Sequence, residues 1–361
     1  MSRGGSHPLG RALWESGLRI DDFSTSGALY LLSHFHSDHR RGLAKKAGGG
    51  PIVASPETAL LAQRILRIPR ERLIVLPAGE SIRLEAPIPL RIEALEANHC
   101  PGAVMFLVEH AEGRLLYTGD FRFDGAMREA VAALPPIDLL VADNTYDHPR
   151  YRFPPLEEAV AEVVAIAERH HKEREVAVAV YTIGKTRILK ALHERLGVPT
   201  YVGEPTARVY EALGLGSLVT RDKAATPLRG YARGYFDTYF KMRREYREGR
   251  VVAIIPTGWA IDVRRPEWNF HYVPYSEHCD FFEREAFVAA VRPAAVEFLL
   301  EGRGEAAVFG AAPLVADARG AGAPIAPTRA AGAQRTQGDG PAPLARGDHP
   351  LFQRSGPLGK K

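Results

Sequence analysis

The sequence predicts an α/β protein with stacked sheets and an outer layer of helices, and with a second α/β unit further along the chain. Short apolar runs separated by turn residues dominate the first 145 residues, which is typical of sheets. From Pro155 the pattern changes to alternating helical and strand periods. A cluster of histidines and carboxylates directly follows a buried run, which indicates a metal site at a strand end.

The first region is predicted to be rich in strands and poor in helices. The apolar run 28–32 leads into the histidine cluster. A helix is predicted to begin after Ser55, because Ser55 suits the N-cap and Pro56 the first helical position. Further strands are predicted at 52–54, 73–76, 90–92, 104–108, 115–118 and 139–142.

The segment after Pro155 is predicted to be a βαβ unit. A helical period covers 156–170, and a second one covers 186–196 and ends at Gly197. Strands are predicted at 176–181 and 200–202, and a helix between two strands implies that they pair in parallel. The unit extends to about Gly249, after which 251–255 again has strand character.

Composition limits the class of protein. The 361 residues are 45% hydrophobic and 25% charged, as in ordinary globular proteins. A net charge of +4 and a pI of about 9.0 permit a polyanionic partner without requiring one. Cys100 and Cys279 are the only cysteines, so a disulfide scaffold is excluded. Residues 1–9 show no secretory signal and no run suits a membrane span, so we expect an intracellular protein without membrane contact.

The motif HFHSDH at 34–39 is the strongest chemical signal. Side chains alternate along a strand, so His34 and His36 share a face, while Asp38 and His39 can turn toward a second position. Imidazole nitrogens and carboxylates bind zinc at about 2.0–2.2 Å. The alternative is a polar turn of surface histidines. The motif predicts a metal site.

Four later segments offer further ligands near predicted strand ends. NHCPG carries His99, TGDFR carries Asp120, DNTY carries Asp143 and YSEH carries His278. Each residue alone has an ordinary alternative, such as a core histidine, a turn carboxylate or a helix start. Together they predict a site for two metal ions.

Counting ligands divides this set into two groups. His34, His36 and His99 can hold one ion, and Asp38, His39 and His278 a second, with Asp120 between them. Two ions about 3.5–4 Å apart favour hydrolytic displacement, because they clamp the attacking and leaving oxygens. The spare coordination positions are typical of a catalytic site. The predicted catalytic residues are Asp38, His39, Asp120, Asp143 and His278.

The blocks HFHSDH, ANHCPGAVMFLVE and LYTGDFR resemble the metallo-β-lactamase fold, and more narrowly the β-CASP DNA cross-link repair nucleases, the group that contains Artemis and Apollo. The resemblance continues through ADNTYDHPRYRFPP, YTIGK, IIPTGW and YSEHCDF, over roughly residues 18–300. It implies an αββα four-layer sandwich with an inserted β-CASP α/β domain. The expected boundaries are 1–148 and 251–302 for the metallo-β-lactamase domain, 149–250 for the insert, and 303–361 for a disordered tail.

The resemblance also implies roles for residues around the metals. Asp21 matches a supporting acidic position, and we expect Asp143 to steady His278 rather than bind a metal. The family holds the terminal 5′-phosphate with a lysine and a serine, which here correspond to Lys185 and Ser276, together with the turn at Thr182 and Gly184. An exposed lysine at a helix start is the alternative. Thr186 departs from the glutamate that often follows this lysine, which weakens the assignment.

Two observations bear on the substrate. Residues 221–250 hold nine Lys and Arg against four Asp and Glu, interleaved with aromatics, as a single-strand channel would need. The alternative is an amphipathic helix with its aromatic face in the core, which we favour for most of these aromatics. RNA-processing relatives tend to carry a histidine near the position of Leu300, and its absence favours DNA.

The sequence therefore predicts a metal-dependent 5′-to-3′ exonuclease that hydrolyses DNA, acting in end processing or cross-link repair. The expected cofactor is Zn²⁺, as one or two ions, with Mg²⁺ or Mn²⁺ as alternatives at the second position. The expected partner is DNA with a 5′-phosphate, bound by a monomer that is cytoplasmic in a prokaryote or nuclear in a eukaryote. The alternatives are an RNA-processing β-CASP nuclease, a small-ester metallo-hydrolase and an inactive nucleic-acid-binding scaffold.

Overall fold

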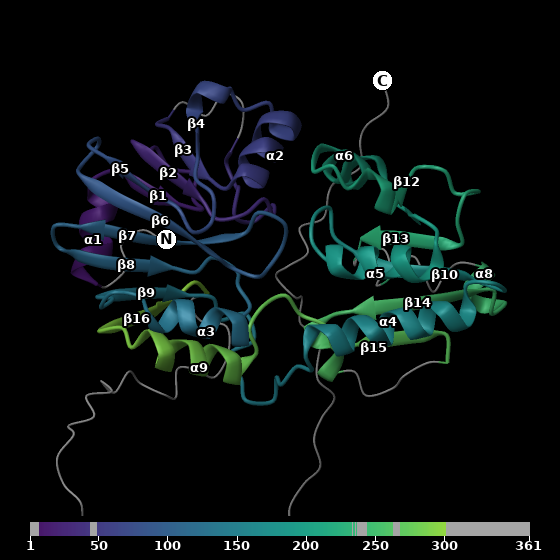
Figure 1. Cartoon of the computed structure of the whole chain (residues 1–361). Coiled ribbons are helices and arrows are strands. Elements are labelled where there is room, and N and C mark those ends of the chain that lie inside the picture. Colours follow the sequence, from purple (N-terminus) through teal and green to yellow (C-terminus); the bar gives the residue numbers. More distant parts are fainter. Residues whose placement is uncertain are drawn as a thin grey trace, which may run out of the picture. The chain divides into compact units, whose positions relative to one another are not determined.

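The computed structural model describes residues 7–43, 49–232, 234, 236, 244–262 and 268–300. Within these residues the chain forms three sheets flanked by helices (Figure 1). The predicted tail at 303–361 lies outside the described residues. None of the described helices has the length and hydrophobicity that a bilayer crossing requires.

The first sheet contains four parallel strands in the order β1-β2-β3-β4. Its central strands β2 and β3 are buried throughout, because both faces of the sheet are covered. The strands are β1 (Leu18–Ile20), β2 (Leu29–Leu32), β3 (Ile52–Ala54) and β4 (Leu73–Val75).

The second sheet is mixed, in the order β16-β9-β8-β7-β6-β5. Strands β5 to β8 form an antiparallel meander, and β9 and β16 then add in parallel. The strands are β5 (Ser81–Leu84), β6 (Leu90–Glu96), β7 (Val104–His110), β8 (Gly113–Tyr117), β9 (Leu139–Ala142) and β16 (Ala295–Phe298).

These two sheets pack face to face between helices, as predicted. Ile20, Leu31 and Val53 of the first sheet share one buried cluster with Phe106 and Leu115 of the second. A further cluster joins the outer faces of both sheets to the helices. Helix α2 (Pro56–Leu66) covers the first sheet, α3 (Gly125–Ala132) and α9 (Phe281–Val291) cover the second, and α1 (Pro8–Glu15) contacts β1 and β8.

Capping residues fix the starts of two of these helices. The Ser55 side chain accepts from the backbone N–H of Thr58, and Pro56 takes the first helical position, as predicted. Asp280 and Glu283 form a capping box at the start of α9. The cap residue Asp280 therefore fixes the chain two residues after His278.

The third sheet is wholly parallel, in the order β12-β11-β13-β10-β14-β15. The predicted parallel βαβ arrangement is present, although β13 lies between β10 and β11. The strands are β10 (Glu175–Val180), β11 (Thr200–Tyr201), β12 (Val219–Thr220), β13 (Leu228–Ala232), β14 (Val251–Pro256) and β15 (Phe270–Val273).

Helices and aromatic residues cover the two faces of this third sheet. One face packs against α4 (Leu156–His170), α5 (Thr186–Leu196) and α6 (Glu204–Ala212), and a short helix α8 (Arg244–Arg247) precedes β14. On the other face Phe236 is buried against Phe270, with Tyr231 and Tyr246 beside them. These aromatics therefore belong to a core, as the favoured interpretation expects, while Tyr235, Tyr239 and Phe240 lie outside the described residues.

The pairing of β14 and β15 differs from the expected domain boundary at residue 250. Both strands continue the sheet of β10, whereas residues 251–302 were expected to return to the first domain. The physical reason is that a fully apolar strand shows burial but not which parallel sheet it joins. The other boundaries stay predictions.

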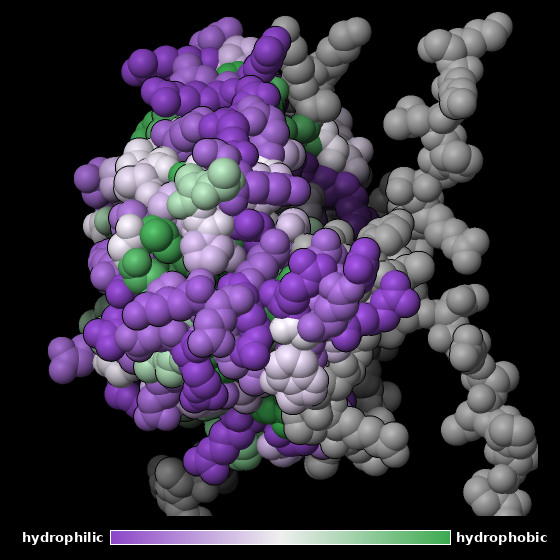
Figure 2. Space-filling model, turned by 90° about the vertical axis from the view of Figure 1, so that its right-hand side faces the viewer, coloured by the Kyte–Doolittle hydropathy of each residue, from purple (hydrophilic) through white to green (hydrophobic). Residues whose placement is uncertain are grey.

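The surface in view in Figure 2 is mostly hydrophilic, with hydrophobic residues in small separate areas.

Candidate metal centre

Strand ends bring several of the predicted ligands to the same end of the first two sheets. His34 and His36 follow β2, His99 follows β6, and Asp120 follows β8. Strands β6 and β8 both run antiparallel to β7, so their C-terminal ends lie at the same edge of the second sheet. The backbone N–H of Val104 donates to the carbonyl of Ser33, which ties the end of β2 to this edge.

Three histidines and one carboxylate form a buried first group. His34 Nε2 lies 2.9 Å from His36 Nδ1, and His99 Nε2 lies 3.1 Å from the same atom. Asp120 Oδ2 is 3.5 Å from the Nε2 atoms of both His34 and His99. Four candidate ligand atoms therefore surround one point at separations that suit a metal with bonds of about 2.0–2.2 Å.

The outer nitrogens of this group are held by neutral oxygens. His36 Nε2 donates to the carbonyl of Ile183 at 2.9 Å, and His99 Nδ1 donates to that of Glu277 at 2.7 Å. His34 Nδ1 lies 3.0 Å from Ser33 Oγ. Because a carbonyl only accepts, a neutral His36 and a neutral His99 have lone pairs on the nitrogens that face each other. A cation between them relieves this repulsion, so the residues fit a metal ion.

A second group lies beside the first and also contacts Asp120. His39 Nε2 is 3.1 Å from Asp120 Oδ1 and 3.7 Å from Asp38 Oδ2. His278 Nε2 is 3.8 Å from Asp120 Oδ2. The Asp38 side chain is 66% exposed, which leaves this group open to solvent. Asp120 contacts both groups, and its role as a bridging ligand stays a prediction.

Two buried carboxylates support the second group from behind. Asp21 Oδ2 lies 2.8 Å from His39 Nδ1, and Asp143 Oδ2 lies 2.7 Å from His278 Nδ1. Asp143 also accepts from the backbone and hydroxyl of Thr145. A carboxylate on the far nitrogen fixes the tautomer and raises the basicity of a ligating imidazole. Asp21 and Asp143 thus contact the histidines that they are expected to support, and the supporting role stays a prediction.

Electrostatics keep the shared carboxylate ionised. Burial opposes the charge of Asp120, but the neighbouring His39 and His278 outweigh it and hold its pKa well below the usual value. Burial also opposes the charged form of His39, whose pKa the carboxylates of Asp120 and Asp21 nevertheless raise well above normal. Burial and the neighbouring histidines lower the pKa of His99. The first group thus combines the Asp120 carboxylate with a His99 that stays neutral, a donor set that suits zinc, whereas His39 must release its proton to bind a metal.

The predicted phosphate-binding residues are only partly brought to this centre. A side-chain carbon at Gly184 would lie 3.3 Å from His36 Nε2, so this turn packs against the first group. Ser276 Oγ accepts from the backbone N–H of His278 at 2.9 Å. Lys185 is buried, and its ammonium donates to the carbonyls of Ala179 and Pro256.

Thr182 is exposed at the start of the same turn. The phosphate-binding role of Thr182, Gly184, Lys185 and Ser276 stays a prediction.

Arg122 and Glu277 were not singled out from the sequence, although both adjoin predicted ligands. Arg122 is buried and donates to the carbonyls of Ser276 and Pro154, so it joins the two segments that enter and leave the third sheet. Glu277 accepts from the backbone N–H of Lys185 and the hydroxyl of Tyr275. The sequence feature that could have identified them is their place in the TGDFR and YSEH blocks, close to Asp120 and His278.

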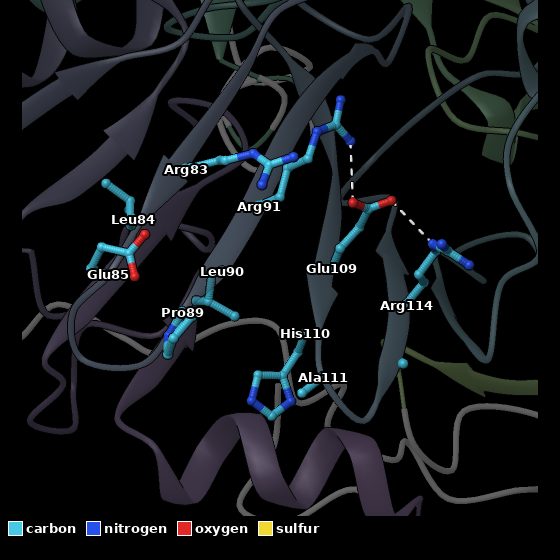
Figure 3. A pocket seen from close by; sticks show the side chains of 11 residues that line it. Arg83, Leu84, Glu85, Pro89, Leu90, Arg91, Glu109, His110, Ala111 and Arg114 are labelled. Carbon is cyan, nitrogen blue, oxygen red and sulfur yellow. Dashed lines mark hydrogen bonds and ion pairs between the residues drawn. The ribbon is translucent and has the colours of Figure 1, made fainter.

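A separate hollow lies at the opposite end of the second sheet. It measures about 450 Å³ and lies by the start of β6 and the end of β7 (Figure 3). Arg91 and Arg114 project there, and both pair with Glu109. Among the described residues the groups with metal-binding geometry all lie at the histidine edge, so the candidate site is placed there.

Comparisons with known proteins agree with this geometry. A β-lactamase superfamily domain matches residues 24–182, and a DNA repair metallo-β-lactamase family matches residues 224–297. The 5′ exonuclease Apollo of Gallus gallus is 34% identical over 277 residues, covering 76% of this chain and 59% of that protein. The DNA cross-link repair 1A protein of Homo sapiens is 27% identical over 322 residues, covering 81% of this chain and 30% of that protein.

Two more relatives extend the comparison. DNA ligase 6 of Arabidopsis thaliana is 32% identical over 298 residues, which are 74% of this chain and 21% of the ligase. This chain thus spans only part of these curated relatives. A solved structure from Enterococcus faecalis V583, titled as a protein of unknown function, has a TM-score of 0.52 at 16% identity and covers 77% of this chain and 80% of its own. That likeness supports the fold alone.

Proposed function

We propose that this chain, which belongs to the β-CASP group of metallo-β-lactamase-fold nucleases, is a metal-dependent 5′-to-3′ DNA exonuclease. DNA cross-link repair proteins are among its relatives. The observation that carries the proposal is Asp120, whose carboxylate contacts both histidine groups. A shared carboxylate between two ligand sets is what a two-metal phosphodiesterase requires.

The ligand assignment follows the two groups. His34, His36 and His99 would hold one ion, Asp38, His39 and His278 a second, and Asp120 would be shared. When bound, the ions supply stabilisation of charge on the attacking and leaving oxygens and a lowered pKa of water. The donor set favours Zn²⁺, and the more exposed, carboxylate-containing second group also suits Mg²⁺ or Mn²⁺.

The remaining residues position this apparatus. Asp21 and Asp143 hold His39 and His278 in the tautomer that leaves Nε2 free to bind. The turn at Gly184 adjoins His36, and Ser276 adjoins His278, so a terminal 5′-phosphate placed between them would set the cleaved bond beside the centre. This arrangement is our proposal for 5′ polarity.

The test is digestion of end-labelled DNA and RNA, each with a 5′-phosphate or a 5′-hydroxyl, in the presence of zinc or manganese. We expect mononucleotides from 5′-phosphorylated DNA, and loss of this product after chelation and in the Asp38→Ala variant. The matched control is Asp22→Ala, because Asp22 only caps its own turn at Ser24 and Thr25. Full activity of Asp38→Ala, or cleavage of RNA alone, would contradict the proposal.

A further inference from the structure

Two exposed aromatic residues stand at the ends of neighbouring strands beside the metal centre. Tyr181 directly follows β10, and Trp259 lies in the 3₁₀ turn Gly258–Asp262 after β14. Strands β10 and β14 pair directly and in parallel, so both residues lie at the C-terminal ends of neighbouring strands. Tyr181 is 47% exposed and Trp259 is 43% exposed, which is unusual for side chains of this size.

Both aromatics are linked to metal-centre histidines. The ring of Tyr181 lies 6.0 Å from that of His36, with an interplanar angle of 65°. Trp259 lies 4.8 Å from Tyr146, and Tyr146 lies 6.1 Å from His278. Tyr181 therefore adjoins the first histidine group directly, and Trp259 is linked to the second through Tyr146.

Their positions are fixed by tight packing. Trp259 meets Tyr151 edge-on at 5.3 Å, and a side-chain carbon at Gly258 would lie 2.5 Å from Tyr146, so the turn before Trp259 fits closely against that ring. The Lys185 ammonium lies 4.5 Å from the centroid of Tyr181 and bonds a carbonyl of each strand. Such support prepares the exposed faces for contact with a ligand at little entropic cost.

Trp268 shows that exposure alone does not define such a site. It is 63% exposed, but it precedes β15, which runs parallel to β14. Trp268 thus lies near the N-terminal ends of these strands, where the Arg174 guanidinium lies over its ring. Among the exposed tryptophans described, Trp259 is linked to the metal centre and Trp268 serves as its matched control.

We propose that Tyr181 and Trp259 stack on nucleobases of the substrate strand next to the cleaved phosphodiester bond. Base–aromatic stacking accepts every base, because each base has a π-face, and it contributes enough to change binding by about tenfold per base. These residues would therefore favour a strand with bases over a bare sugar-phosphate chain, without sequence preference. The inference rests on the proposed nuclease function and extends it to a base-binding subsite.

The experiment compares 5′-phosphorylated single strands that differ only at their first two nucleotides, which carry either ordinary bases or abasic tetrahydrofuran residues. We expect wild-type protein to cleave the ordinary strand about 100-fold more efficiently in kcat/KM, which is about tenfold for each of the two stacked bases. Trp259→Ala should lower this discrimination by about tenfold, by slowing only the ordinary strand. Trp259→Phe should retain most of it, and Tyr181→Phe should behave as wild type, because stacking needs the ring and not the hydroxyl.

The controls separate this inference from the proposed function. Trp268→Ala should keep full discrimination. A Trp259→Ala protein that keeps the full wild-type discrimination, or that slows both strands equally, would overturn the inference and leave the nuclease proposal intact.

A binding measurement decides the inference even if no nucleic acid is cleaved. An oligonucleotide with 2-aminopurine at its 5′ end loses fluorescence when that base stacks. We expect quenching with wild-type protein and with Trp268→Ala, and at least severalfold less with Trp259→Ala or Tyr181→Ala. Equal quenching by all four proteins, or none with wild type, would contradict the base-binding subsite.

Discussion

The two halves of the metal centre are supported in different ways. In the first half, His34, His36 and His99 are held from behind by a hydroxyl and two carbonyls, all neutral. In the second half, buried carboxylates hold His39 and His278. In the first half His34 and His99 are buried and His36 is half-buried, whereas the second half contains the exposed Asp38.

This difference shows how the protein balances burial against charge. In the first half, low dielectric surroundings and rigid backbone acceptors fix the imidazoles, and added anions would be costly to bury there. In the second half, solvent weakens electrostatic interactions, and the supporting carboxylates compensate by making the imidazoles stronger donors. Changes to the shared residue should therefore affect both halves, and changes to Asp143 should affect only the second.

The largest effect is expected from Asp120→Ala, because Asp120 contacts both halves. Removal of the shared anion should weaken both metal sites and lower DNA hydrolysis by more than about 100-fold, beyond the effect of losing a supporting residue. Metal content by mass spectrometry and initial rates measure this, with Asp22→Ala as control. An Asp120→Ala variant that retains two zinc ions would contradict the claim that both metal sites depend on Asp120.

An intermediate effect is expected from Asp143→Asn. The amide preserves the shape and an acceptor for His278 Nδ1 but removes the charge. Zinc affinity of the second half should fall by about 10–100-fold while that of the first half is unchanged. Competition with a chromophoric chelator resolves the two affinities. Equal weakening of both sites would show that the halves are not supported independently.

The smallest effect is expected from Cys279→Ser, next to His278. The Cys279 sulfur is buried and accepts from the backbone N–H of Phe123 at 3.1 Å. A hydroxyl of similar size can accept the same bond, so the free energy of unfolding should change by about 1 kcal/mol or less. Thermal unfolding and metal content both check this. A lost metal ion would mean that the second half depends on this sulfur.

Much of the fold could be predicted because the signals are local. Ser55 and Pro56 mark the start of α2, Gly197 ends α5 in a left-handed conformation, and the apolar run of β2 leads directly to His34. The sheet of β14 could not be predicted, since its apolar residues would suit either parallel sheet.

The candidate site was predictable in its ligands but not in its surroundings. The spacing of HFHSDH predicts a cluster of ligands, which the structure brings together with His99 and Asp120. Nothing local shows that Lys185 turns its ammonium toward the carbonyls of Ala179 and Pro256. The buried link through Arg122 and the placement of Trp259 depend on contacts between distant segments. Such contacts arise only when the third sheet packs beside the first two.

The central claim is that one chain binds two metal ions in halves that share Asp120. Native mass spectrometry of zinc-loaded protein tests it most directly, with wild type compared to Asp38→Ala. We predict two ions per chain in wild type and one in Asp38→Ala, because the buried first group does not use Asp38. One ion in wild type at saturating zinc, or two in Asp38→Ala, would contradict the account.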